Sequence, residues 1–119
     1  MLYSFVRSKE GDMDKKINIV KSIRQEGDTL TVELFGSLSA NNVADFDDAL
    51  EGKLDGIQNL IIDMKKMTYL TSAGARSLIK AIKKLSEHGG KVTARHINND
   101  SMTVLELLNI HKLITIEEE

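Results

Sequence analysis

The sequence predicts a single α/β domain in which helices pack against a mixed, mainly parallel sheet of about four to five strands. Two observations support this fold class. The chain has 119 residues, of which 41% are hydrophobic, which is enough for one core. Short apolar runs also alternate with stretches whose apolar residues recur at helical spacing. The predicted order is β-β-α-β-α-β-α-β, and such alternation favours parallel strands joined by right-handed crossovers.

The first two strands are predicted to form a hairpin. Residues 17–24, INIVKSIR, are rich in apolar β-forming residues, and Glu26-Gly27-Asp28 is a turn signal. Residues 29–36, TLTVELFG, alternate apolar and polar side chains as a half-buried strand does. An antiparallel pair is the simplest arrangement of these two segments.

A helix is expected after the hairpin, because apolar residues recur there at a spacing near 3.6. Ser39, Asn41 or Asn42 can cap this helix. Its apolar positions are Val43, Phe46, Ala49, Leu50 and Leu54. Three early aspartates complement the helix dipole, and we interpret them as a solvated face in preference to a metal cluster: Asp45, Asp47 and Asp48.

The middle of the chain predicts a buried strand followed at once by a helix. Residues 59–64, NLIIDM, are continuously apolar before Asp63, as in a strand that is buried on both faces. The helix is expected from Ala73 to Glu87, with one apolar stripe formed by residues 75, 78, 79, 82 and 85. Gly89-Gly90 is a typical stop for such a helix.

Three further elements are expected toward the end of the chain. Residues 91–97, KVTARHI, predict a short strand, and residues 112–116, KLITI, predict the last one. Between them, NNDSMTVLELLNI predicts a capped helix. The inward residues of that helix are expected to be Val104, Leu105, Leu107 and Leu108.

Residues 1–16 are expected to be an N-terminal extension, which leaves residues 17–119 as the domain. The apolar LYSFV at its start is too short for a signal peptide, and it can form an extra strand or dock on a partner. No apolar run approaches the ~20 residues of a membrane span. We therefore expect a cytoplasmic protein with no membrane insertion.

Charge and cysteine content exclude several other classes. The chain has 16 basic and 18 acidic residues, a formal charge of −2, which points to neither nucleic acid nor a membrane surface. It contains no cysteine, so disulfides and thiolate metal sites are excluded. Its three histidines lie at separations that match no common zinc pattern, so no metal and no cofactor are expected.

The corner between residues 67–70 and the following helix consists of small residues, Thr71-Ser72-Ala73-Gly74. A serine at a helix start is most often a cap, worth about 1 kcal/mol. The same position suits a phosphate, because the N–H groups and the dipole of a helix N-terminus favour an anion. Arg76, one turn further on, can bind such a phosphate or an acidic group of a partner.

Residues 59–90 resemble the core of a STAS domain, the family of bacterial anti-sigma factor antagonists. The shared features are an apolar strand that ends in Asp63, a short loop over residues 67–70, the corner with Ser72, a helix, and Gly89-Gly90. The segments TLTVELFGSLSANNVADFDDAL and VLELLNIHKLITI also resemble the flanking parts of the family. The resemblance covers about residues 17–116.

The resemblance implies a protein-binding switch and no enzyme. Ser72 occupies the position that a partner phosphorylates, and Thr71 is a less favoured acceptor. The partner is an anti-sigma factor or serine/threonine kinase of the histidine-kinase-like ATPase type, a phosphoserine phosphatase resets the cycle, and the domain is a monomer or weak dimer. The implied partner-binding residues are Ser39, Thr71, Ser72, Ala73, Gly74, Arg76 and Lys80.

The chain departs from the family pattern at three places. Thr71 stands where an Asp usually precedes the acceptor, and Ser39 stands where many members have another Asp. Leu108-Asn109 replaces a Ser/Thr-Gly pair before the last strand. Because both replaced acids lie at the end of the domain that faces the kinase, a scaffold module without a phospho-switch is the main alternative.

Two other interpretations compete with the switch. Ser72 with a histidine and Asp63 suggests a hydrolase triad, but Leu70 occupies the first glycine of the G-x-S-x-G elbow. A cluster of cations near the corner is interpreted first as a solvated face, and a docking surface for an acidic partner is the alternative. These cations are Lys65, Lys66, Arg76, Lys80, Lys83 and Lys84.

Overall fold

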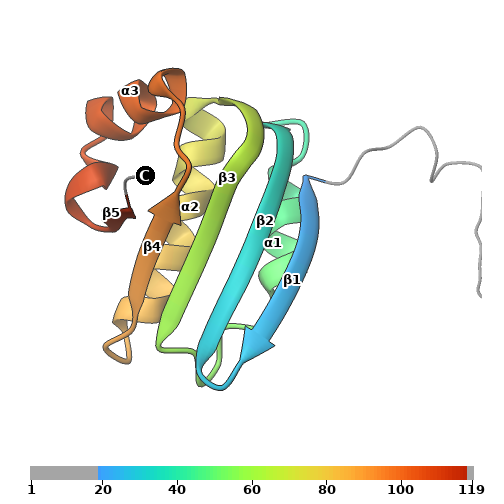
Figure 1. The fold of residues 1–119 in the computed structure, drawn as a ribbon, viewed down its shortest axis with the longest axis vertical. Coiled ribbons are helices and arrows are strands. Elements are labelled where there is room, and N and C mark those ends of the chain that lie inside the picture. The colour runs from blue at the N-terminus through green and yellow to red at the C-terminus, as the bar shows by residue number, and fades with distance from the viewer. Residues whose placement is uncertain (1–18, 118–119) are drawn as a thin grey trace, which may run out of the picture.

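The computed structural model describes residues 19–117, in which five strands form one sheet in the order β1-β2-β3-β4-β5 (Figure 1). The strands are β1 (Val20–Glu26), β2 (Thr29–Leu38), β3 (Asn59–Leu70), β4 (Lys91–Arg95) and β5 (Thr115–Glu117). The first pair is antiparallel and every later pair is parallel. The expected α/β fold and the order of its elements are confirmed. The proposed extension over residues 1–16 lies outside the described residues.

The predicted hairpin is present at the start of the sheet. Glu26 pairs with Thr29, and Gly27 between them has a φ of 62°, a left-handed conformation that glycine adopts without steric cost. The alternation in β2 is also confirmed, because Leu30, Val32 and Leu34 are all buried in the core.

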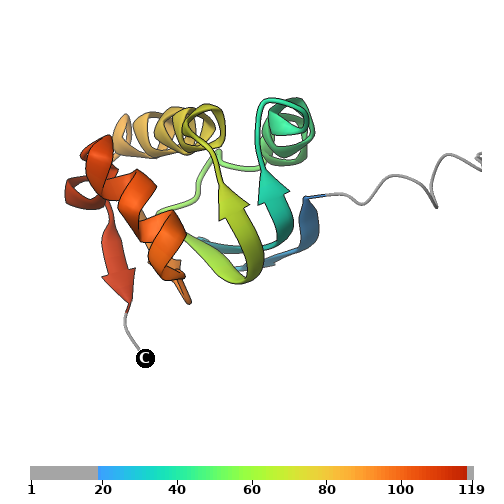
Figure 2. The same ribbon diagram turned by 90° about the horizontal axis from the view of Figure 1, so that it is seen from above.

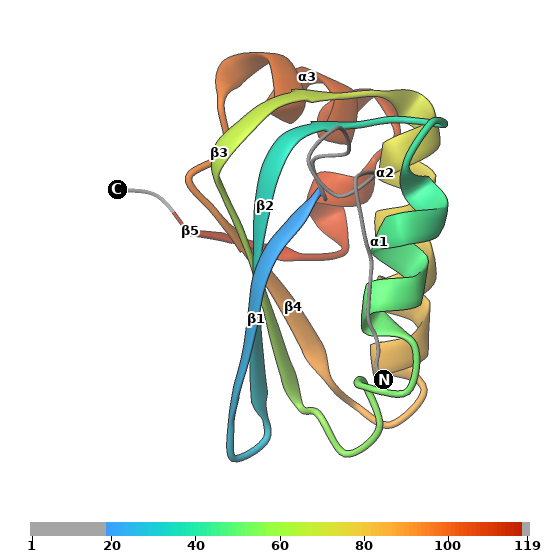
Figure 3. The ribbon, with the colours of Figure 1, turned by 90° about the vertical axis from the view of Figure 1, so that its right-hand side faces the viewer.

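The helices α1 (Val43–Leu50) and α2 (Ser72–Ser86) cover the same face of the sheet (Figures 2 and 3). The opposite face of the hairpin and β3 is therefore open, and we call it the outer face. This arrangement corrects the prediction that β3 is buried on both faces. Leu60 and Ile62 are buried under the helices, whereas Ile61 between them is only half-buried.

β3 is longer than predicted, because residues 67–70 continue the strand and do not form a loop. Two β-bulges make this possible, since its register against β2 shifts twice after the pair Glu33↔Asp63. In this part of β3 every third residue is buried, namely Met64, Met67 and Leu70. Between these buried residues lie two exposed pairs of neighbours, Lys65-Lys66 and Thr68-Tyr69. Each bulge therefore places two consecutive side chains on the outer face.

The helix α2 has the predicted buried stripe, with Ala75, Leu78, Ile82 and Leu85 in the core. Its end is also as predicted. The Gly90 N–H donates to the Leu85 carbonyl at 2.8 Å, and Gly89 has a φ of 82°. The helix α1 ends at Leu50, earlier than its apolar pattern suggested, although Leu54 beyond it is buried.

The C-terminal part differs from the prediction in two respects. In α3 (Asn99–Leu107), Leu105 is buried but Leu107 is 77% exposed. The reason is that residues two positions apart in an α-helix point to nearly opposite sides. Val104 and Leu108 are half-buried. The last strand is reduced to three residues, because a short 3-10 helix (Ile110–Lys112) takes up the start of the predicted segment.

Candidate functional site

The turns that follow β2 and β3 lie side by side at one edge of the sheet. The two strands are parallel and end in register, with Leu38 opposite Leu70. Ser39 therefore adjoins Thr71, and α2 begins directly after the end of β3 (Figure 1). In open parallel sheets this edge is where functional loops gather.

Thr71, and not Ser72, caps α2. The Thr71 hydroxyl accepts a hydrogen bond from the Gly74 N–H at 3.1 Å and donates to the Leu38 carbonyl at 3.1 Å. The Thr71 N–H donates to the same carbonyl at 3.1 Å. The interpretation of Ser72 as the cap is thus corrected, because the hydroxyl of Thr71 already carries the capping contact.

Ser72 is the first residue of α2, and its side chain is exposed. Its hydroxyl forms no hydrogen bond with any of residues 19–117. The N–H groups in the first turn of a helix have no intrahelical partner and carry the positive end of its dipole. A reachable, unengaged hydroxyl therefore lies at a helix terminus that favours negative charge.

Gly74 allows α2 to approach the end of β2 closely. A Cβ on Gly74 would lie 2.4 Å from the carbonyl oxygen of Leu38 and 2.8 Å from the Cγ of the same leucine. Real Cβ atoms essentially never come this close to other atoms. The adjoining Ala73 is half-buried. Small residues at this corner therefore reflect close packing of helix on strand, and they also leave Ser72 without a bulky neighbour in the first turn of its own helix, up to Ala75.

The turn after β2 is held by Asn42, the residue before α1. Its side-chain oxygen accepts from the Ser39 N–H at 2.9 Å, and its side-chain nitrogen donates to the Ser37 carbonyl at 2.7 Å. Asn42 occupies the cap position, but its side chain makes no capping hydrogen bond to α1. The Ser39 hydroxyl accepts from the Asn41 N–H at 3.3 Å, so Ser39 helps to shape the turn beside Thr71.

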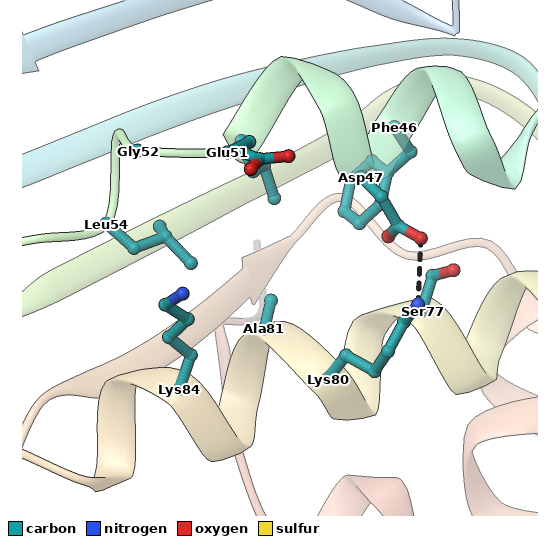
Figure 4. Close-up of a pocket in the computed structure, with 10 residues that line it drawn as sticks. Phe46, Asp47, Glu51, Gly52, Leu54, Ser77, Lys80, Ala81 and Lys84 are labelled. Atoms are coloured by element: carbon teal, nitrogen blue, oxygen red, sulfur yellow. Dashed lines mark hydrogen bonds and ion pairs between the residues drawn. The ribbon is translucent and has the colours of Figure 1, made fainter.

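Lys80 belongs to a different feature, the groove between α1 and α2. It forms an ion pair with Asp47 at 2.9 Å across this groove, which has a volume of about 470 Å³ (Figure 4).

Arg76 is exposed one turn after Ser72. The structure therefore brings Ser39, Thr71, Ser72, Ala73 and Gly74 together, with Arg76 close by, while Lys80 lies a further turn along the helix. The groove is lined by Phe46, Asp47, Leu50, Glu51, Gly52, Leu54, Ser77, Lys80, Ala81 and Lys84.

The structure separates the components of the imagined hydrolase triad. His96 is paired with Asp63 at 2.9 Å, but Asp63 lies seven residues before the end of β3, roughly 20 Å of strand from the corner. Burial raises the pKa of Asp63, but the hydrogen bonds from His96 and the Lys65 N–H, with the charges of His96 and Arg95, outweigh it and lower the pKa. Ser72 hydrogen-bonds to neither member of the pair.

Asn98 is a structural residue that the sequence pattern did not single out. Its side-chain nitrogen donates to the Met67 carbonyl at 3.2 Å, and its oxygen accepts from the Ser101 N–H at 2.8 Å. One side chain thus caps α3 and also satisfies a backbone carbonyl at the second bulge of β3. A capping signal was visible in the sequence, but the bulge that requires this anchor was not.

The described part of the chain holds no group of three or more His, Asp or Glu side chains arranged to bind a metal ion. None of the helices over residues 19–117 has the length and apolar character needed to cross a membrane.

Comparison with known proteins identifies relatives of the fold. The STAS domain family model matches residues 20–119. No curated protein sequence matches the chain significantly. SpoIIAA, an anti-sigma factor antagonist, has a similar structure in its unphosphorylated form, with a TM-score of 0.73, 12% identity, and coverage of 82% of this chain and 86% of SpoIIAA.

Two further solved structures show the same likeness. The Bacillus cell fate determinant SpoIIAA in its phosphorylated form has a TM-score of 0.67 and 12% identity, over 82% of this chain and 89% of the other. An anti-sigma factor antagonist from Mycobacterium paratuberculosis has a TM-score of 0.68 and 20% identity, over 80% and 81%. At these identities the likeness shows the shared fold.

Proposed function

Because this chain belongs to the STAS domain family, we propose that it is an anti-sigma factor antagonist switched by phosphorylation at Ser72. Its partner is an anti-sigma factor that is also a serine/threonine kinase of the histidine-kinase-like ATPase type. The observation that carries the proposal is the exposed, unengaged hydroxyl of Ser72 at the first position of α2. The chain acts by binding in the cytoplasm and performs no catalysis of its own.

The chemistry of the transfer suits Ser72 better than Thr71. The Ser72 oxygen attacks the γ-phosphate of ATP, ADP leaves, and the hydroxyl proton passes to a base of the kinase. Thr71 is the weaker acceptor, because its hydroxyl already donates to Leu38 and accepts from Gly74. Phosphorylation of Thr71 would break both contacts and remove the cap of α2.

The domain tolerates a phosphate on Ser72 without unfolding. A phosphoserine carries about −1.5 to −2 charges near neutral pH, and the start of α2 favours an anion. SpoIIAA, which shares this fold, has been solved in both unphosphorylated and phosphorylated forms. We therefore expect the phosphate to act on the interface and not on the stability of the fold.

The partner surface centres on the two turns that adjoin Ser72. Unphosphorylated Ser72, Ala73 and the neighbouring Ser39 present a small, neutral surface to the kinase. Phosphorylation places a hydrated dianion in that interface, and its unpaired desolvation or repulsion costs several kcal/mol of binding free energy, on the order of 2–5 kcal/mol. Arg76 orients the phosphate or an acidic group of the partner.

The test uses a candidate anti-sigma kinase encoded beside the gene for this chain. The kinase, ATP and the purified protein are incubated together, and the modified residue is mapped by mass spectrometry. We expect one phosphate, on Ser72, that is lost in Ser72→Ala and retained in Ser86→Ala, a control at another exposed serine of α2. Phosphate on another residue, with Ser72→Ala modified normally, would refute the switch.

The alternative is a scaffold module that binds its partners without a phospho-switch. It is favoured by Thr71 and Ser39, which replace the acidic residues that the resemblance leads one to expect around the acceptor. The two functions differ in their response to Ser72→Asp. A switch loses its kinase partner in a pull-down with this variant, whereas a scaffold retains all its partners at the same stoichiometry.

A further inference from the structure

The outer face of the sheet carries two of the cations that are expected from the sequence near the corner around Ser72. Lys65 and Lys66 are exposed at the first bulge of β3, on the face opposite to α1 and α2. They are therefore separated from the cations of α2. The two bulges also expose Thr68 and Tyr69 on β3.

A lysine from β1 joins this group. The register between β1 and β2 shifts between Val20 and Ser22, which leaves Lys21 as the extra residue of another bulge. Lys21 and Lys66 flank the same part of β2, because Lys21 follows Val20, which pairs with Leu34, and Lys66 lies opposite Phe35. Interaction with Lys21 lowers the pKa of Lys66. Side chains from β1 and β3 thus meet across β2 and hold two like charges together.

No carboxylate within residues 19–117 neutralises these lysines directly. Among residues 19–117, none of Lys21, Lys65 and Lys66 forms an ion pair. The two nearest acids have other contacts, because Glu33 accepts from the Ser22 hydroxyl at 3.0 Å and Asp63 is paired with His96 at 2.9 Å. Two adjacent ammonium groups repel one another, and an external anion between them would remove that repulsion.

Exposed aromatic side chains flank the lysines. Phe35 of β2 lies opposite Lys66 in the register and is 39% exposed. Tyr69, three residues beyond Lys66, is 51% exposed. These are two of the four large hydrophobic side chains exposed over residues 19–117, and the other two lie near the C-terminus. Apolar surface is therefore concentrated beside the lysines.

We propose that an acidic, partly apolar segment of a partner protein docks on this outer patch, defined as Lys21, Phe35, Lys65, Lys66 and Tyr69. A carboxylate of the segment lies between Lys21 and Lys66, and an apolar side chain packs on Phe35 and Tyr69. The patch is proposed independently of the switch at Ser72, although Tyr69 brings its edge to the corner.

An acidic protein segment suits the patch better than a nucleic acid. Glu33 and Asp63 both act electrostatically on Lys66, so they lie near it and would repel a continuous phosphate backbone more strongly than a single carboxylate. Over residues 19–117, only two exposed aromatic rings, those of Phe35 and Tyr69, are available for stacking bases. The formal charge of −2 over the whole chain also disfavours a polyanion.

The test is an NMR titration of the isotopically labelled protein with a short synthetic peptide of Glu, Leu and Gly. We expect shifts of the backbone amides around Lys21, Phe35, Lys66 and Tyr69, and weaker binding as salt is added. Lys21→Glu combined with Lys66→Glu should weaken binding about tenfold. Lys53→Glu combined with Lys83→Glu changes the net charge equally at exposed lysines elsewhere, and should bind almost as wild type.

Two further ligands in the same titration test whether the partner must be acidic and whether it is a protein. A peptide of Lys, Leu and Gly should not bind, and an oligothymidylate should bind more weakly than the acidic peptide. The proposal is overturned if the acidic peptide leaves the patch amides unshifted, if both double variants weaken binding equally, or if the oligothymidylate binds more tightly. Because no kinase or ATP is present, these outcomes do not depend on the phosphorylation of Ser72.

Discussion

At the scale of single residues, the neighbouring hydroxyls of Thr71 and Ser72 have separate tasks. The Leu38 carbonyl and the Gly74 N–H both bind Thr71, which leaves the hydroxyl of Ser72 exposed. The sequence predicted a capped helix start at this corner but assigned the cap to Ser72. Both residues are good caps, and only the approach of the β2 end to α2 decides between them.

The close approach at Gly74 leads to a prediction at the same scale. Gly74→Ala should lower the free energy of unfolding by about 1–3 kcal/mol, because overpacking against the Leu38 backbone outweighs the higher helix propensity of alanine. Urea denaturation monitored by circular dichroism measures the change. Lys83→Ala, at an exposed position of the same helix, should change stability by less than about 0.5 kcal/mol. Equal stability of Gly74→Ala and wild type would contradict the packing described for this corner.

At the scale of elements, the second half of β3 could not be predicted from the spacing of its apolar residues. An apolar residue at every third position, as in Met64, Met67 and Leu70, matches neither the period of a strand nor that of a helix. The sequence therefore indicated a strand only up to Met64. Two bulges reconcile the pattern with a continuous strand, and bulges leave no signal in the local sequence that identifies them in advance.

Asn109, which stands at the glycine position of the family pattern, has a left-handed backbone conformation. Asn109 follows the last turn of α3 with a φ of 60°, a left-handed conformation that asparagine adopts more readily than most residues. The predicted last strand began too early, because the 3-10 helix after Asn109 was not visible in the apolar pattern.

The cap of α2 gives a prediction for that helix. Thr71→Val keeps the side-chain shape but removes the hydroxyl that binds Gly74 and Leu38, so it should cost about 1–2 kcal/mol of unfolding free energy. Thr71→Ser keeps both contacts and should stay within about 0.5 kcal/mol of wild type. The midpoints of chemical denaturation measure both effects. If Val and Ser were equally destabilising, methyl packing and not capping would be the role of Thr71.

At the scale of the whole molecule, the order of strands and helices followed from the sequence, but the open face of the sheet did not. The apolar run at residues 59–64 is typical of a strand covered on both sides, yet α1 and α2 lie on the same face. Side-chain pairs join the C-terminal strands across the sheet, with Asp63–His96 linking β3 to the end of β4 and Arg95–Glu117 linking β4 to β5.

The Asp63 pair makes the stability of the whole domain depend on pH. The native pKa of Asp63 is lowered, so the unfolded chain binds more protons as pH falls below about 4. The stabilisation is therefore complete above the unfolded pKa and is lost as pH falls through the native one. Asp63→Asn should be less stable than wild type at neutral pH, and the difference should shrink in acid. Thermal unfolding across pH measures it, and a difference independent of pH would exclude this linkage.

The two consecutive lysines in β3, Lys65 and Lys66, also affect the chain before it folds. A long apolar strand in the middle of a sheet can stack with its copies into fibrils while the chain is still unfolded. Together with Asp63, Lys65 and Lys66 break up the apolar residues of the strand between Leu60 and Leu70, and charges at these positions keep neighbouring chains apart. The bulges that let the folded strand accommodate both lysines thus allow the same residues to act as gatekeepers against aggregation.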